Sequence, residues 1–475
     1  MGSSMKIFAP VPARLAADRT PADRDRVVDL ARAAALLVVV AGHSIMAVVA
    51  WPGGVPKMGN LLAAYPWTQL LTWALQIMPL FFFAGGAANA LSYDRHRARG
   101  GSYATWLWGR ADRLLRPALV YLVIMGIVAA IVTVVAPSDV AAPLMELTTQ
   151  LLWFLGAYLL VTAMTPWFRS TTPVRGGLVT LAILALSAAI DVGVLLLGLP
   201  GFLALSSFAI VWAVPAYVGS LRSHGVLERV PRPVLVGVVV GGLAINVAII
   251  ALGPWPMSMV GMPGDVVSNM APPTVVLGIH SVILCCLVTL FDAQLARFTQ
   301  RPRVWRLVTA VNLAAMTLYL WHLPVLITVT VLGHALHLER PTVIDGTGWP
   351  VPDGWGYLLG CLVFWAVYGV GVWAIVRLMW PFEHAPLWWW DSPPRMSAPN
   401  PRAASVIACV GTVAVGISGL VLSACGLAGF PTRIIDYAGI PLSAAAGMLL
   451  LLAGGAAIRW AGAPRTTAER PVVAA

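Results

Sequence analysis

The chain of 475 residues carries little charge. Lys, Arg, Asp and Glu together make up 10% of it, whereas soluble domains carry about a quarter. Lysine is almost missing, with two residues against 28 arginines, and there are only five cysteines. Apolar residues make up 59% of the chain, and the mean hydropathy is +0.84. This composition excludes a soluble globular fold and predicts an all-α polytopic membrane protein.

Most of the charged residues are basic, and nearly all of the basic ones are arginine. The net charge of +11 does not indicate a nucleic-acid partner, because cations in a membrane protein follow its topology. Arginine in place of lysine, with abundant Ala, Val and Gly, is typical of a GC-rich bacterial genome. The cysteines all fall in apolar stretches and are interpreted as packing residues rather than as disulfides or a metal site. They are Cys285, Cys286, Cys361, Cys409 and Cys425.

Long apolar stretches recur along the whole chain, and each is long enough to cross a bilayer as a helix. The twelve predicted spans cover residues 28–50, 67–93, 113–136, 147–167, 175–198, 202–220, 233–253, 274–296, 307–333, 355–380, 403–429 and 434–458. If the N-terminus is cytoplasmic, the inner segments hold 27 of the 30 cations, and the outer segments hold Lys57, Arg340 and Arg433. This split predicts an even number of spans with both termini in the cytoplasm, in a bacterial inner membrane.

The spans predict a division of the chain into five parts. These are a cytoplasmic tail (1–25), a ten-span core (26–383), a cytoplasmic linker rich in Pro and Trp (384–402), two additional transmembrane helices (403–460) and a second cytoplasmic tail (461–475).

Two segments of the core depart from a plain apolar helix. The second span contains Met78-Pro79 and the pair Gly85-Gly86, which predicts a break that surrounding protein must satisfy. Residues 106–117 carry Arg110 and Arg113 at a spacing of three, which places both on one face of an amphipathic helix running into the third span. An ordinary positive-inside loop and an anion site explain these arginines equally well.

The first span contains an arginine and a histidine eleven residues apart. At about 100° per residue, Arg32 and His43 lie on one stripe of a helix, with about 16 Å between them along its axis. A charged group near the bilayer centre costs roughly 2.5–3.5 kcal/mol, so such residues indicate function by default. His43 is therefore either a satisfied packing histidine or a functional group that exchanges protons, which histidine does near neutral pH.

A second histidine lies at a similar depth. His322 follows Tyr319 in the ninth span, and two histidines at one level predict a second polar site shared with His43. His280 is interpreted as structural, and Asp191 and Asn246 as contacts between helices. His334 and His337 have the spacing of metal ligands but no third ligand in the sequence, so no metal is expected. The outer acidic residues are candidates for lining an acceptor site, and equally for ordinary loops: Asp265, Asp345 and Asp353.

Five short motifs, in this order, resemble the acyltransferase 3 family of membrane-bound O-acyltransferases. They are Arg32 with His43, FFFAGG at 81–86, RADRLLRPALVY at 110–121, LWFL at 152–155 and LYLWH at 318–322. The resemblance covers residues 26–383. Gly85 replaces the usual serine, and Gly109 stands where a doubled arginine is common. The last two spans lie outside the resemblance and leave the acceptor open.

The resemblance implies an acyl-CoA-dependent O-acyltransferase. It implies transfer of an acyl group, usually acetyl, from cytoplasmic acetyl-CoA or another acyl-CoA to a hydroxyl of a glycan, a lipid-linked acceptor or a small molecule. His43 would be the catalytic histidine, and Arg32, Arg110 and Arg113 would contact the acyl-CoA. Whether His43 acts as general base or becomes acylated stays open, as does an oligomeric state. Membrane lipid is the other expected partner.

A secondary transporter or flippase with twelve spans is the alternative. The broken second span favours it, because transporters place broken helices at the bilayer midplane. The second half of the chain does not repeat the first, which weakens this interpretation. A structural membrane subunit without catalysis would leave Arg32 and His43 unexplained.

Overall fold

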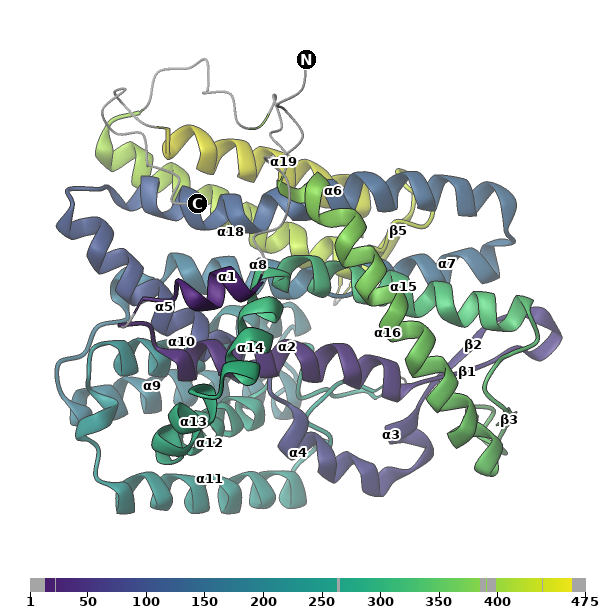
Figure 1. The fold of residues 1–475 in the computed structure, drawn as a ribbon, viewed down its shortest axis with the longest axis horizontal. Coiled ribbons are helices and arrows are strands. Elements are labelled where there is room, and N and C mark those ends of the chain that lie inside the picture. The colour runs from purple at the N-terminus through teal and green to yellow at the C-terminus, as the bar shows by residue number, and fades with distance from the viewer. Residues whose placement is uncertain are drawn as a thin grey trace. The chain divides into compact units, whose positions relative to one another are not determined.

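The structure, a computed structural model, describes residues 13–21, 23–262, 265–384, 390, 399–437 and 439–463. Within these residues it consists of helices and three two-stranded antiparallel hairpins (Figure 1). In the part of the chain that the structure describes, eleven helical segments are long and apolar enough to cross a membrane, and there are twelve if the bent pair α12 (Val275–Leu290) and α13 (Asp292–Thr299) counts as one span. The predicted all-α polytopic membrane protein is confirmed. Of the predicted tails and linker, residues 1–12, 385–389, 391–398 and 464–475 lie outside the described residues.

The chain forms two compact units. Unit 1 is made of Met1–Ala88 and Arg169–Pro381, and unit 2 of Asn89–Phe168 and Phe382–Ala475. The predicted ten-span core contributes to both, and the two additional spans belong to unit 2. Helix α5 (Met78–Ala98) runs from one unit into the other, and so does α16 (Gly354–His384) at its end.

Unit 1 is built around α2 (Arg26–Met46), which carries Arg32 and His43. Three elements from the later part of the chain pack against it, namely α13, α14 (Pro302–Leu313) and α15 (Ala315–Ala335). The other elements described in this unit are α1 (Ala13–Asp18), α3 (Leu61–Ala64), η2 (Pro66–Leu70), α4 (Leu71–Leu75), α9 (Pro173–Asp191), η4 (Val192–Leu196), η5 (Gly201–Ser206), α10 (Ser207–Ser223), η6 (Leu227–Arg229) and α11 (Arg232–Leu252).

Charged side chains fix the start of α2. Asp25 caps the helix by accepting hydrogen bonds from the backbone N–H groups of Val27 (3.0 Å) and Val28 (3.1 Å). The guanidinium of Arg222 on α10 joins that carboxylate (2.8 Å) to the one of Asp292 on α13 (2.6 Å). Two helices, α10 and α13, are therefore tied to the first turn of α2.

At its other end α2 stops at Met46, and the chain continues as a strand rather than as the helix predicted up to residue 50. Strand β1 (Ala47–Ala50) pairs with β2 (Lys57–Asn60), with η1 (Pro52–Gly54) in the turn. A second hairpin, β3 (Thr342–Ile344) with β4 (Pro350–Pro352), packs on the first, and the Thr342 hydroxyl donates to the Val49 carbonyl (3.2 Å). Residues 47–60 and 340–352 are called the hairpin cap below (Figure 1).

The predicted break in the second span is confirmed, and it lies between α4 and α5. The loop before α12 closes it. The Trp73 indole donates to the Met257 carbonyl (2.9 Å), the Gln76 amide donates to the Met259 carbonyl (2.9 Å), and the Met259 N–H donates to the Thr72 hydroxyl (2.9 Å). Side chains beside the break thus satisfy backbone groups of this loop, and the Met78 N–H at the break donates to the Gln76 side-chain oxygen (3.4 Å).

The glycine pair does not interrupt α5, which is where the prediction for this span was wrong. Gly86 is needed for packing, because a Cβ there would lie 2.0 Å from the Ala216 carbonyl oxygen on α10. Gly219 on α10 is equally close to the Phe83 carbonyl oxygen. Small residues allow α5 and α10 to approach backbone to backbone.

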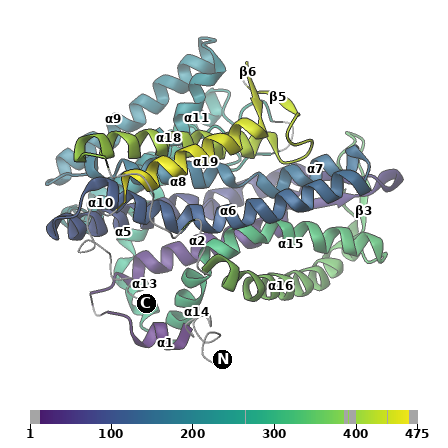
Figure 2. The same ribbon diagram turned by 90° about the horizontal axis from the view of Figure 1, so that it is seen from above.

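Unit 2 contains α6 (Tyr103–Val135), α7 (Ser138–Thr149), α8 (Leu152–Ala163), η3 (Thr165–Trp167), α18 (Pro401–Cys425) and α19 (Ala444–Ala461). The additional helices α18 and α19 lie side by side (Figure 2). They touch through Gly411 and Gly454, and α18 meets α8 through Gly156 and Gly419. The two additional helices are therefore packed into this unit as closely as its other members are.

The eighth, ninth and twelfth predicted spans also have different boundaries in the structure. The ninth span begins at Ala315, because α14 is a separate amphipathic helix. The eighth bends by 65° between α12 and α13. In the twelfth, β5 (Ile434–Tyr437) pairs with β6 (Ile440–Ser443) as a hairpin, so that span starts at Ala444. Apolar content alone does not distinguish a β-branched strand end from a helix.

Candidate active site

The N-terminal half of α2 presents Arg32 beside a buried carboxylate. Arg24 grips both oxygens of Asp29, with Nε–Oδ2 at 2.6 Å and a terminal nitrogen at 2.8 Å from Oδ1. Arg32 approaches the same carboxylate only to 3.8 Å, and its side chain is 21% exposed. Asp29 therefore holds Arg32 loosely, and the fork of Arg32 keeps N–H donors available for an anion.

Deeper along α2, His43 meets the histidine of α15. The Nδ1 atom of His43 lies 2.9 Å from Nε2 of His322, and the two rings are nearly parallel, with 2° between their planes and 5.2 Å between their centroids. His322 is fully buried, whereas His43 is half-buried. The structure thus brings the two predicted histidines together into one polar site, called the dyad below.

The contacts of His322 determine where the protons of the dyad lie. Its Nδ1 is 2.9 Å from the carbonyl oxygens of Leu318 and Tyr319, which can only accept, so Nδ1 carries the hydrogen. In a neutral ring Nε2 then has the lone pair, and it accepts from the Nδ1–H of His43. The lone pair of neutral His43 is therefore on Nε2, the nitrogen turned away from His322.

Helix α16 supports the backbone on both sides of the dyad. The hydroxyl of Tyr368 lies 3.4 Å from the Val40 carbonyl on α2 and 3.5 Å from the His322 carbonyl on α15. Tyr319 is buried one turn before His322, and its carbonyl contacts the dyad. The three helices of the site are thus joined at the level of the two histidines.

Arg110 and Arg113 lie on α6 in unit 2, in a single helix that includes the predicted amphipathic segment. A capping box starts this helix, with Ser102 and Thr105 each bonding the other's backbone N–H. Arg113 is exposed and Arg110 is half-buried. Between them, the Asp112 carboxylate accepts a hydrogen bond from the Trp390 indole (2.6 Å), which fixes the rotation of this part of α6.

The remaining predicted polar residues have structural contacts. Asp191 accepts from the backbone N–H of Val275 (2.7 Å) at the start of α12, and Asn246 donates to the Val276 carbonyl (3.1 Å), so both connect helices as predicted. His280 is buried beside Trp73. His334 stacks on Trp51 at 4.1 Å, with Nδ1 3.4 Å from the Glu339 carboxylate.

Asp345 belongs to the turn between β3 and β4. Its carboxylate accepts hydrogen bonds from the hydroxyl (2.6 Å) and N–H (2.9 Å) of Thr347 and from the N–H of Trp349 (2.9 Å). These bonds, the Thr347 hydroxyl first, hold the pKa of Asp345 below its usual value. The residue stabilises the hairpin turn, which is sufficient to explain it.

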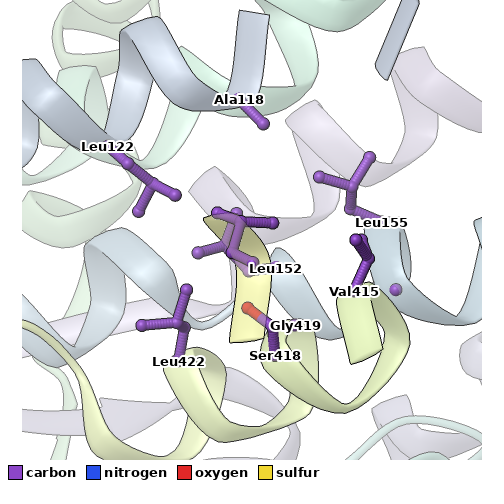
Figure 3. A pocket seen from close by; sticks show the side chains of 10 residues that line it. Ala118, Leu122, Leu152, Leu155, Val415, Ser418, Gly419 and Leu422 are labelled. Atoms are coloured by element: carbon purple, nitrogen blue, oxygen red, sulfur yellow. The ribbon is translucent and has the colours of Figure 1, made fainter. Parts of the chain in front are cut away.

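A small cavity in unit 2 is separate from these groups. It is lined by apolar side chains of α6, α8, α18 and α19, with the hydroxyl of Ser418 among them (Figure 3). Its volume of about 10 Å³ is near the lower limit for one water molecule. It is too small for a substrate.

Three contributors to the site were missed by the sequence analysis. Asp29 had a recognisable signal, a carboxylate three residues before Arg32 in an apolar run. Tyr368 had none, since a tyrosine in an apolar span is ordinary. Arg340, whose contacts are described below, stood out only as one of three outer cations.

The fold is that of a helical membrane protein, and its first long helix carries a histidine that is hydrogen-bonded to a second one. These two features are those of a candidate membrane-embedded enzyme. Comparison with protein families identifies an acyltransferase domain over residues 25–382. The chain therefore belongs to the acyltransferase 3 family. Searches of curated proteins and of solved structures found no match.

Proposed function

We propose that this membrane acyltransferase moves an acyl group, acetyl in the first instance, from acyl-CoA to a hydroxyl of a glycan, a lipid-linked acceptor or a small molecule. The observation that carries the proposal is the dyad, because its hydrogen bonds leave the Nε2 lone pair of His43 available as a base. We place the protein in a bacterial inner membrane with both termini in the cytoplasm, on the basis of the 27 inner cations.

The donor would enter from the cytoplasmic side. Arg32, Arg110 and Arg113 are proposed to bind the phosphates of the CoA moiety by charge-assisted hydrogen bonds. Arg32 suits this role, since its only charged partner among the described residues is Asp29 at 3.8 Å. From Arg32 the pantetheine arm would follow α2 over about 16 Å, which is eleven residues of helix rise, to His43.

The transfer step uses both nitrogens of His43. Nε2 takes the proton of the acceptor hydroxyl while its oxygen attacks the thioester carbonyl, and the Nδ1–H to His322 stabilises the imidazolium that forms. The tetrahedral intermediate then collapses, the C–S bond breaks, and Nε2 returns the proton to the leaving thiolate. The products are the ester and free CoA, and the histidine ends as it began.

The broken second span does not favour the transporter alternative. The side chains of Thr72, Trp73 and Gln76 beside the break hydrogen-bond to backbone groups of the loop at Met257 and Met259, and these bonds close the break. A transporter would instead use such a break to expose backbone groups to a substrate. The acyltransferase therefore remains the single proposal.

The test compares the wild type with His43→Ala in liposomes, using radiolabelled acetyl-CoA and a membrane extract as the source of acceptors. His43→Ala should lose at least about 100-fold in product formation, the usual effect of a general base. Acetyl-CoA binding, measured by calorimetry, should stay unchanged because the arginines are intact. His337→Asn is the matched control, because His337 is exposed and its backbone φ of 55° suits asparagine. Near-normal turnover in His43→Ala would refute the assignment.

A further inference from the structure

Arg340 is a buried cation in the hairpin cap, whose residues include one other cation, Lys57. It is 7% exposed, and within the described residues it has no carboxylate partner. Its contacts are with the Ala47 carbonyl oxygen (2.7 Å), the Tyr357 hydroxyl (3.2 Å) and the Cys361 sulfur (3.8 Å). Burying a guanidinium costs free energy, so such a position calls for an explanation.

The contact with Ala47 places Arg340 at the end of α2. Ala47 is the residue that caps the helix, and its own N–H donates to the carbonyl of His43. The guanidinium therefore lies about one helical turn, roughly 6 Å, beyond the dyad. A cation is favourable there, because the last carbonyls of a helix carry partial negative charge.

A stripe of α16 connects Arg340 with the dyad. Residues Tyr357, Cys361, Phe364 and Tyr368 repeat at intervals of four, three and four, so they share one face of the helix. The guanidinium lies over the rings of Tyr357 (5.1 Å) and Phe364 (4.2 Å). The Phe364 ring stacks on Tyr368, with 6.2 Å between centroids.

The stripe ends at the two histidine helices, because the Tyr368 hydroxyl lies at the carbonyls of Val40 and His322. The opposite faces of α16 are apolar and exposed, with Leu362 at 62% and Val370 at 65%. Contacts through this stripe therefore hold α16 against α2. Arg340 contacts three of the four stripe residues, Tyr357, Cys361 and Phe364, at the C-terminal end of α2.

We propose that Arg340 is a positioning residue for the dyad. It clamps the outer end of α2 to the α16 stripe, and so fixes His43 against His322 in the geometry that leaves Nε2 free. This inference rests on the proposed function, and it adds a residue that touches neither substrate nor reacting atoms. Its effect should be large, since a displacement of 1 Å costs about 100-fold in rate.

The first test measures release of free CoA from acetyl-CoA by the full chain in liposomes. Arg340→Gln should lower turnover about 10- to 100-fold, with the acetyl-CoA affinity unchanged. Arg340→Lys should recover part of the loss, because an ammonium can still donate to the Ala47 carbonyl but lacks the planar fork. Tyr357→Phe, which removes one hydrogen bond and keeps the ring, should give a smaller loss. Arg433→Gln is the control, since Arg433 is another outer arginine, paired with Glu146 in unit 2.

A second test needs no activity and separates this inference from the proposed function. His43→Cys and His322→Cys are introduced together and are cross-linked by a short bis-methanethiosulfonate reagent. The native cysteines are replaced by alanine except Cys361, which is buried and contacts Arg340. The cross-link should form readily with Arg340 present and weakly in Arg340→Gln. An equal yield in both, or a turnover of Arg340→Gln equal to that of the wild type in the first test, would overturn the positioning role.

Discussion

His43 Nδ1 and His322 Nε2 lie 2.9 Å apart, although 279 residues separate the two histidines along the chain. The backbone carbonyls of Leu318 and Tyr319 orient His322, and His322 in turn orients His43. The catalytic proposal therefore depends on the second histidine as much as on the first. The following predictions test this relationship and the features that surround it.

Replacement of His322 should impair transfer without weakening acyl-CoA binding. His322→Ala removes the acceptor for the His43 Nδ1–H, so the ring can turn and change tautomer, and turnover should fall about 100-fold or more. His322→Gln should lose less, because its side-chain oxygen can still accept from Nδ1. Steady-state kinetics with labelled acetyl-CoA and a calorimetric binding curve provide the comparison.

His337→Asn serves as the control for both variants of His322. Thermal unfolding in detergent must first show that each variant is folded, since His322 is fully buried. If His322→Ala and the wild type turn over equally well per folded molecule, His43 does not need its partner and the dyad is structural.

The arginines of α6 are expected to bind acyl-CoA. Arg110→Ala and Arg113→Ala should each weaken acetyl-CoA binding about 10- to 100-fold, because a charge-assisted hydrogen bond contributes roughly 1.5–3 kcal/mol. Replacement by lysine should restore only part of the affinity, since lysine lacks the bidentate fork. Calorimetry with acetyl-CoA measures each dissociation constant.

Arg175→Ala is the matched control for charge, because Arg175 is an exposed cation near the start of α9. It should bind acetyl-CoA normally. Equal affinity in the wild type, Arg110→Ala and Arg113→Ala would mean that these arginines do not bind acyl-CoA and serve only to orient the chain in the membrane.

The proposed topology can be read from single introduced cysteines. All five native cysteines are free, and four are buried, so their replacement provides a clean background. A cysteine at Asp345→Cys, in the turn of the hairpin cap, should react with a membrane-impermeant maleimide added to intact cells. One at Arg303→Cys on α14 should react only after the membrane is opened. The reverse pattern would invert the topology and the direction of donor entry.

Close packing of α5 on α10 should make Gly86 sensitive to a single methyl group. In Gly86→Ala the new Cβ would lie 2.0 Å from the Ala216 carbonyl oxygen, so the helices must separate. The expected loss of stability is about 1–3 kcal/mol, seen as a lower apparent Tm in detergent at a fixed scan rate. Gly177→Ala on α9, where a Cβ meets nothing within 4 Å, should be neutral or stabilising. Equal Tm values for Gly86→Ala and the wild type would contradict the packing argument.

Much of the fold was predictable because a bilayer imposes local rules. Each span must satisfy its own backbone hydrogen bonds, so a long apolar stretch such as 233–253 becomes a helix wherever its neighbours lie. The predictions failed where an apolar stretch left the helix, as at Ala47 and Ile434. There the pairing partner decides the structure, and a strand and a buried helix end have the same composition.

The site divides in the same way. The sequence by itself determined that Arg32 and His43 share one face of a helix, because helical periodicity is a property of neighbouring residues. It also indicated the depth of His322, which follows from counting residues into a span. Only the tertiary structure showed which nitrogen of His43 is free. It also showed that Arg340 and Tyr368 contact the helix that carries His43. These follow from contacts between α2, α15 and α16, and a contact between helices arises from surfaces that meet only when the chain is packed.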